Sequence, residues 1–76
     1  MELDKIKIKQ DLVKEGDIRD SQGRYEEAIN FYDKVLQIDP DDADAWFNKG
    51  ITLKKMGKHS EGTRSIETAI NLYIGR

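Results

Sequence analysis

The feature that most constrains the fold is a repeat within the chain, because the sequence matches itself at a spacing of 34 residues. The two copies carry glycines at the same places: Gly16 aligns with Gly50, and Gly23 aligns with Gly57. A fixed period of this size indicates one supersecondary unit used twice, with each copy packed against the other. The function of such a chain is expected on a surface built by stacking. Further aligned pairs are Leu12 with Trp46, Glu27 with Glu61, and Tyr32 with Ile66.

Apolar residues recur at helical spacing in four segments. In the second segment Ala28, Tyr32 and Val35 follow one another at three and four residues, which places them on one stripe of a helix. The alternation typical of a strand is confined to residues 6–9, which are too few to make a sheet. The sequence therefore predicts an all-α fold. The expected helices run from about Leu3 or Lys9 to Ser21, from Tyr25 to Gln37, from Ala43 to Met56, and from His59 to Tyr73.

Glycine, proline and aspartate mark the expected helix ends. Gly23 and Gly57 end the first and third helices. Pro40 cannot continue the second helix, and Asp41 or Asp42 can accept hydrogen bonds from the free N–H groups that begin the third. We therefore expect two antiparallel helical hairpins stacked side by side in a short, flat slab.

The first helix is expected to bury a face made of Ile8, Leu12 and the aliphatic stem of Arg19. Gly16 is expected at its point of closest approach to a neighbour. On the third helix, Trp46 is expected to pack inward.

Composition excludes several classes of protein. The 76 residues include no cysteine, which removes a disulfide framework and a thiolate zinc site. Thirteen basic and 15 acidic residues give a net charge of −2, which argues against the basic surface of a nucleic-acid-binding module. No apolar run approaches a signal peptide or the roughly 18 residues of a membrane span. We expect a cytoplasmic protein that binds neither nucleic acid nor a membrane.

No group of residues in the sequence predicts catalysis or a bound ion. His59 is the one histidine, and no second histidine or cysteine can join it around a metal. His59 stands where a phosphate loop needs Ser or Thr, and Pro40 and Asp44 break the pattern of a calcium loop. We expect no enzymatic activity, no metal and no cofactor.

In its period, its glycines and its Asp39-Pro40 helix ending, the chain resembles the tetratricopeptide repeat family of 34-residue helix–turn–helix units. The resemblance implies an α-solenoid fragment without a C-terminal capping helix. It divides the chain into an N-terminal extension or extra helical turn at residues 1–8, a first repeat at 9–42 and a second at 43–76. The residues that carry it are Leu12, Gly16, Ala28, Tyr32, Val35 and Pro40 in the first repeat, and Trp46, Gly50, Leu53, Gly62, Ile66 and Ala69 in the second.

Five positions depart from the pattern of this family. Glu15 and Lys49 stand in place of a leucine, Arg19 in place of a tyrosine, and Ile74 in place of a proline. Gly62 replaces an alanine and is expected to weaken the fourth helix by roughly 1 kcal/mol.

The resemblance also implies a non-enzymatic module that binds a peptide or helix of another protein on its concave face, which the first helix of each hairpin lines. Asn48 matches an asparagine with which many members hold a peptide backbone or carboxylate. Val13 and Asp17 stand where that carboxylate clamp needs a lysine and an asparagine, so an acidic tail is not the expected partner. The charged members of the face are equally consistent with a solvated surface. The residues carried over to this face are Val13, Asp17, Asp20, Phe47, Asn48, Ile51, Lys54 and Lys55.

The last helix carries more apolar residues than its own hairpin covers. Stacked repeats need a capping element with a polar outer face, and an uncovered apolar patch marks an interface. Two compatible interpretations follow. The chain is a fragment of a longer array, or two chains form a homodimer by end-to-end stacking or a helix swap, which is the alternative function. RNA binding through Lys54, Lys55, Lys58 and Arg64 is a third hypothesis, disfavoured by the acidic isoelectric point. The expected self-association residues are Ile66, Ile70, Tyr73 and Ile74.

Overall fold

The computed structural model describes residues 2–75, which form four helices. The predicted all-α fold of two helical hairpins is confirmed, and the first helix takes the longer of its two expected forms. Met1 and Arg76, the outermost residues of the predicted extension and second repeat, lie outside the described residues. The helices are α1 (Glu2–Ser21), α2 (Tyr25–Ile38), α3 (Ala43–Lys55) and α4 (His59–Tyr73).

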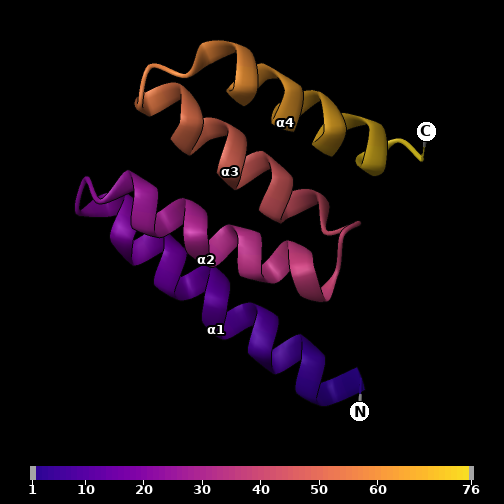
Figure 1. The fold of residues 1–76 in the computed structure, drawn as a ribbon. Coiled ribbons are helices and arrows are strands. Elements are labelled where there is room, and N and C mark those ends of the chain that lie inside the picture. Colours follow the sequence, from indigo (N-terminus) through magenta and orange to yellow (C-terminus); the bar gives the residue numbers. More distant parts are fainter. Residues whose placement is uncertain (1, 76) are drawn as a thin grey trace.

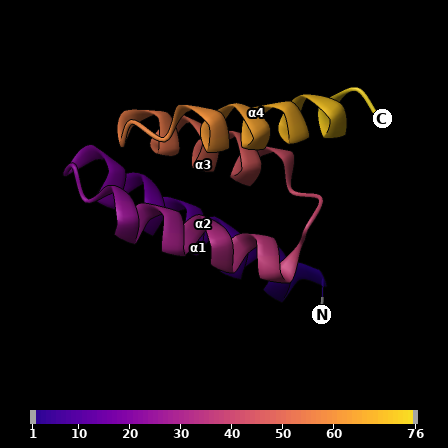
Figure 2. The ribbon, with the colours of Figure 1, turned by 45° about the horizontal axis from the view of Figure 1, so that its top comes forward.

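The four helices lie side by side in chain order across a slab that measures 38 × 32 × 15 Å (Figure 1). Each helix packs mainly on its neighbour in sequence, so α1 and α2 form one hairpin and α3 and α4 form the other. Figure 2 shows the two hairpins joined by the α2–α3 connection, which lies at the same end of the slab as both chain ends. The thin dimension is little more than one helix diameter, so most side chains keep some contact with solvent.

The two hairpin turns are equivalent. Gly23 has φ +76° and Gly57 has φ +85°, a left-handed conformation that glycine adopts without strain. The N–H of Arg24 donates to the carbonyl of Arg19 at 2.9 Å, and the N–H of Lys58 donates to the carbonyl of Leu53 at 2.9 Å. These hydrogen bonds satisfy carbonyls that the helix ends leave free. The predicted breaks at both glycines are thus confirmed.

The connection between the hairpins is fixed by its own polar groups. The N–H of Asp39 donates to the carbonyl of Val35, so α2 ends before Pro40 as predicted. Of the two predicted caps, Asp42 is the one used: its Oδ1 accepts from the N–H of Ala45 at 3.0 Å. Trp46 is half-buried beside this turn, and its Nε1 donates to the carbonyl of Pro40 at 2.8 Å.

The first hairpin closes where α1 carries a glycine. Gly16 is buried, and a Cβ added there would lie 2.6 Å from Cε1 of Tyr32. Tyr32 is itself buried on α2, beside Ala28 and Val35. The aromatic ring therefore occupies the space that a side chain at position 16 would need, which confirms the predicted close approach.

The second hairpin closes on two glycines. A Cβ added to Gly62 would lie 2.7 Å from the carbonyl oxygen of Gly50 and 2.7 Å from Cγ of Lys54. A Cβ added to Gly50 would lie 2.6 Å from Cγ1 of Ile66. From helix propensity alone, Gly62 was expected to weaken the fourth helix. In the structure, the glycine allows the backbones of α3 and α4 to approach each other closely.

One predicted core residue is wrong. Ile8 is 49% exposed and faces solvent, whereas Leu12 and Arg19 are partly buried. The next residue, Lys9, turns toward the α2–α3 connection and takes the inward place on this turn of α1. Neighbouring helical residues differ by about 100° in direction, so the isoleucine points away.

Among residues 2–75, no helix combines the length and apolar character that crossing a bilayer requires.

Candidate functional site

A groove runs along one face of α1 and reaches the first turn of α3. Its volume is about 490 Å³. We call it the α1/α3 groove. It is lined by Ile6, Lys9, Gln10, Val13, Lys14 and Asp17 of α1 and by Asp42 and Asp44 at the start of α3.

The α1 side of this groove is a helical stripe. Ile6, Gln10, Val13 and Asp17 follow one another at intervals of four, three and four residues, which align side chains on one face of a helix. The isoleucine and the valine supply an apolar floor, and the aspartate closes the stripe at one end. Because Ile6 lies near the start of α1 and Asp17 near its end, the stripe runs along more than half of this helix.

Two aspartates of the groove are held by tyrosine hydroxyls. Tyr32 donates to Oδ1 of Asp17 at 2.6 Å, and Tyr73 donates to Oδ1 of Asp44. Burial first, and then the hydrogen bond to Asp17, raises the pKa of Tyr32. The hydrogen bond to Asp44 raises the pKa of Tyr73 to about 12. Tyrosine hydroxyls are protonated at neutral pH even at their ordinary pKa of about 10, so both donate to and orient the two carboxylates.

The lysine that lines the groove beside them is already paired. Nζ of Lys9 lies 2.8 Å from Oδ2 of Asp39 and 3.0 Å from Oδ2 of Asp42. Hydrogen bonds to these two carboxylates raise the pKa of Lys9, and the same contact lowers the pKa of Asp39. The lysine thus ties α1 to the α2–α3 connection, and its charge is balanced within the chain.

The charged residues predicted for the concave face take different places. Asp17 lies in the α1/α3 groove, but Asp20 accepts from Thr52 at 2.9 Å and from Lys55 at 2.7 Å. The hydrogen bond to Asp20 raises the pKa of Lys55. Nζ of Lys54 donates to Oγ1 of Thr63 at 2.9 Å, so this side chain reaches toward α4. The two lysines therefore diverge.

The apolar and amide residues predicted for this face divide as well. Val13 lines the groove. Phe47 is 40% exposed, and Asn48 and Ile51 are half-buried on α3. These three residues lie along α3 outside the lining of the groove.

The residues predicted for self-association lie on α4 and just after it. Ile66 is half-buried and contacts the backbone region of Gly50. The other three are Ile70, Tyr73 and Ile74, and each is about half exposed.

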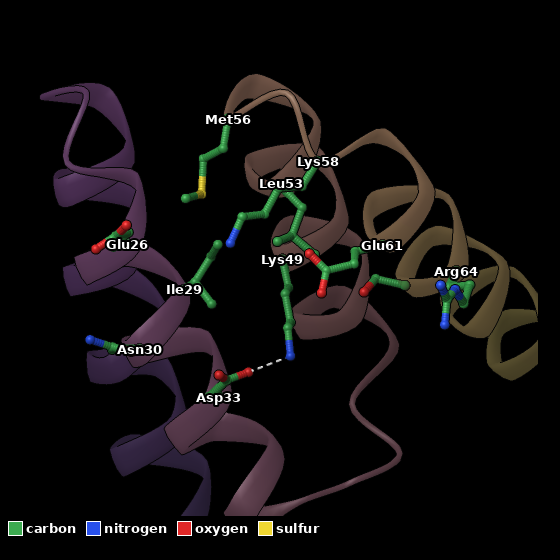
Figure 3. A pocket seen from close by; sticks show the side chains of 11 residues that line it. Glu26, Ile29, Asn30, Asp33, Lys49, Leu53, Met56, Lys58, Glu61 and Arg64 are labelled. Atoms are coloured by element: carbon green, nitrogen blue, oxygen red, sulfur yellow. Dashed lines mark ion pairs between the residues drawn. The ribbon is translucent and has the colours of Figure 1, made fainter.

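A second groove lies between α2 and α4, with α3 as its floor (Figure 3). Its volume is about 510 Å³. Nζ of Lys49 pairs with Oδ1 of Asp33 across it at 2.7 Å. We call it the α2/α4 groove. It is lined by Glu26, Ile29, Asn30, Asp33, Lys49, Leu53, Met56, Lys58, Glu61, Arg64 and Ser65. Cations and carboxylates alternate around its apolar residues Ile29, Leu53 and Met56, so it presents no uniform charge to a ligand.

Sequence reasoning missed Ile6, Gln10, Lys9, Lys14, Asp42 and Asp44 as groove residues. The signal for the first two was present, because the spacing that selects Val13 and Asp17 continues toward the N-terminus. No local sequence pattern predicts Asp44 as a groove residue, because it lines the groove only when the two hairpins stack. Within the described part of the chain, no three His, Asp or Glu side chains are placed to hold a metal ion.

Comparison with known proteins gives two family matches. A model described as TPR repeat matches residues 16–57, and one described as Tetratricopeptide repeat matches residues 43–73. Among curated proteins, the uncharacterized protein MJ0572 of Methanocaldococcus jannaschii is 34% identical over 41 residues. The aligned region is 54% of this chain and 48% of that relative, so the match spans about half of the relative's length.

Proposed function

Because this chain belongs to the tetratricopeptide repeat family, whose repeats commonly mediate protein–protein interactions, we propose that it is a non-enzymatic module that binds a peptide or helix of another protein. The fold alone does not fix a function, so the proposal depends on the surfaces that these residues build.

The observation that carries the proposal is the α1/α3 groove. It offers an apolar floor, exposed carboxylates and a length set by α1. From Ile6 to Asp17 the helix rises by about 17 Å, enough to contact about three turns of a partner helix. Phe47, which is 40% exposed, lies outside the lining but only one helical turn after the groove residue Asp44 on α3. A surface of this size belongs to the small, transient class of interfaces, and we expect affinities near the micromolar range.

A photo-crosslinking amino acid at either of two exposed polar positions tests where the partner lies. Gln10 lines the α1/α3 groove, and Asn30 lines the α2/α4 groove and serves as the matched control. We expect a partner protein to be captured from position 10 and not from position 30. Capture only from position 30 would refute the assignment of the groove.

The affinity of the captured segment is then measured by calorimetry against the double variant Phe47→Ala with Asn48→Ala. We expect at least a tenfold loss, since removing an aromatic anchor at an interface costs more than about 1 kcal/mol. If the affinity is unchanged in a variant that keeps its melting temperature, these residues of α3 are not part of the binding face.

Self-association through α4 is the second candidate. Its support is the row of half-exposed apolar residues Ile70, Tyr73 and Ile74. Light scattering over a concentration series distinguishes it from the first proposal, because a dimer raises the mean mass with concentration. A mass that stays at 8.8 kDa at the highest concentration would eliminate it.

A further inference from the structure

We infer that the α1/α3 groove accepts a cationic amphipathic helix, with a lysine or arginine of that partner engaging Asp17 and Asp44. The inference rests on the proposed function and specifies the chemistry of the partner.

The charge of the groove is the first argument. Of its three aspartates, Asp42 uses Oδ1 to cap α3 and Oδ2 to pair with Lys9. Asp17 and Asp44 are different: each accepts one tyrosine hydroxyl through Oδ1. Across residues 2–75, no ammonium or guanidinium nitrogen lies within 4.0 Å of either carboxylate.

The groove therefore keeps negative charge after its internal pairs are formed. The other cation of the lining is Lys14, which is exposed and forms no ion pair with the described residues. Each of the two carboxylates retains an Oδ2 for which the described residues supply no donor. A charged hydrogen bond from a partner cation is stronger than one from a neutral donor, and Arg can bind a carboxylate through two N–H groups.

The tyrosines make these carboxylates a prepared site. Tyr32 is buried, so its hydroxyl holds the Asp17 carboxylate in one orientation before any partner arrives. Tyr73 is 55% exposed and donates to Oδ1 of Asp44 from the last helix. A partner cation thus meets oriented acceptors and loses less conformational entropy on binding than it would at a free surface side chain.

The apolar residues of the groove favour a partner helix that carries an apolar stripe of its own. Ile6 is 47% exposed, and Val13 lies two turns further along the same face. Apolar residues at the spacing of helical turns pack on an amphipathic helix that carries its own apolar residues at three and four positions. A cation beside that apolar stripe then reaches the aspartate end of the groove. An acidic helix would instead meet like charge there.

Two synthetic, fluorescein-labelled peptide helices of about 14 residues test the inference, a length that covers the α1 face. Both carry leucines at three- and four-residue spacing. One carries lysines on the flanks of the leucine stripe, and the other carries glutamates at the same places. Fluorescence anisotropy measures the affinity of the whole 76-residue chain for each. We expect the lysine peptide to bind at least tenfold more tightly than the glutamate peptide, with an affinity that falls as salt is added.

Matched variants separate the groove from general attraction to an acidic protein. Asp17→Asn with Asp44→Asn removes two charges from the groove, while Glu26→Gln with Glu61→Gln removes two from the α2/α4 groove. We expect the first pair of substitutions to lower the affinity for the lysine peptide about tenfold, and the second pair to leave that affinity unchanged. Equal weakening by both pairs would overturn the inference.

A second matched pair tests the apolar floor. Ile6→Ser changes a groove residue and Ile8→Ser changes an almost equally exposed residue on another face of α1. Only Ile6→Ser is expected to lower the affinity for the lysine peptide. Thermal unfolding of every variant verifies that the fold is kept.

The outcomes also separate this inference from the proposed function. If the glutamate peptide binds better and loses affinity in Ile6→Ser, the groove binds helices and the cationic partner is wrong. If neither peptide binds, or no groove variant alters binding, the cationic inference is refuted. Capture from Gln10 by photo-crosslinking then decides separately whether the groove is a binding surface at all.

Discussion

Alanine at Gly16 is the substitution for which the core of the first hairpin gives the sharpest expectation. In an unobstructed helix, replacing glycine by alanine stabilises by about 1 kcal/mol, because glycine loses more backbone entropy on folding. Here the new methyl group would lie 2.6 Å from Cε1 of Tyr32. Carbon atoms in favourable contact stay about 3.5–4.0 Å apart. The steric clash opposes the gain in helix propensity, and the size of the clash decides whether Gly16→Ala lowers or raises the free energy of unfolding.

The ring of Tyr32 has little room to yield. It is 2% exposed, and its hydroxyl donates to Asp17 at 2.6 Å. A shift of about 1 Å would overpack the core, at a cost of about 1–3 kcal/mol. The same shift would weaken a hydrogen bond to a charged group, which is worth about 1.5–3 kcal/mol when fully formed. After the gain in helix propensity is subtracted, we expect Gly16→Ala to lower the free energy of unfolding by about 2 kcal/mol. The melting temperature should fall by about 10 °C, since 1 kcal/mol corresponds to about 4–8 °C in a domain of this size.

Far-UV circular dichroism during urea and thermal unfolding measures this effect. In a Tyr32→Leu background the obstructing ring is gone, so the same Gly16→Ala change should stabilise by about 1 kcal/mol. Gly23→Ala is the control. Its φ is +76° and its added Cβ would meet nothing within 4 Å, so it should cost about 1 kcal/mol in both backgrounds. A rise in melting temperature for Gly16→Ala in the parent chain would refute the packing of Tyr32 on this glycine.

Three further expectations concern helix ends and contacts. Gly62→Ala should lower the free energy of unfolding by about 1 kcal/mol, because its Cβ would lie 2.7 Å from a carbonyl oxygen of α3; a more stable variant in urea would contradict this. Asp42→Ala removes the cap of α3 together with the ion pair to Lys9 and should cost at least about 1 kcal/mol in thermal unfolding, whereas Asp41→Ala, on an exposed side chain, should change stability by less than about 0.5 kcal/mol. The hydrogen bond from the ammonium group of Lys9 lowers the pKa of Asp39 in the folded protein. This ion pair therefore stabilises the fold above the unfolded pKa of Asp39, which is about 4, and the stabilisation is lost as pH falls through the lower, folded pKa. Acid titrations of unfolding should show a shallower decline below pH 4 for Asp39→Asn, and an unaltered slope would count against the ion pair.

The repeat and its turns could be predicted from the sequence because their causes are local. A glycine with positive φ ends each first helix of a hairpin, and Pro40 ends α2 whatever the rest of the chain does. The close approach at Gly16 was also predictable, since apolar spacing on α1 and α2 places the glycine opposite the aromatic residue Tyr32. Ile8 was misplaced because its apolar character was counted and the two carboxylates that draw Lys9 inward were not.

The candidate site was less predictable because its geometry depends on contacts between residues far apart in sequence. Spacing places Lys54 and Lys55 next to each other on α3, yet one donates to α4 and the other to Asp20 on α1. Their divergence depends on which acceptors the neighbouring helices supply, and no single segment contains that information. Asp44 likewise becomes a groove residue only because stacking brings the start of α3 beside α1.

The core and the α1/α3 groove share residues, and this links the stability of the fold to the charge of its surface. Tyr32 fills the space beside Gly16 with its ring and orients Asp17 with its hydroxyl. Lys9 joins α1 to the connection between the hairpins and in doing so neutralises Asp42. The ion pair that fixes the stacking therefore takes up one cation and one carboxylate of the groove, and the buried tyrosine orients Asp17, which is left without a cation. The electrostatic preference of the groove follows from how the hairpins pack, so a substitution that loosens the packing should weaken the preference for a cationic partner even when it lies outside the groove.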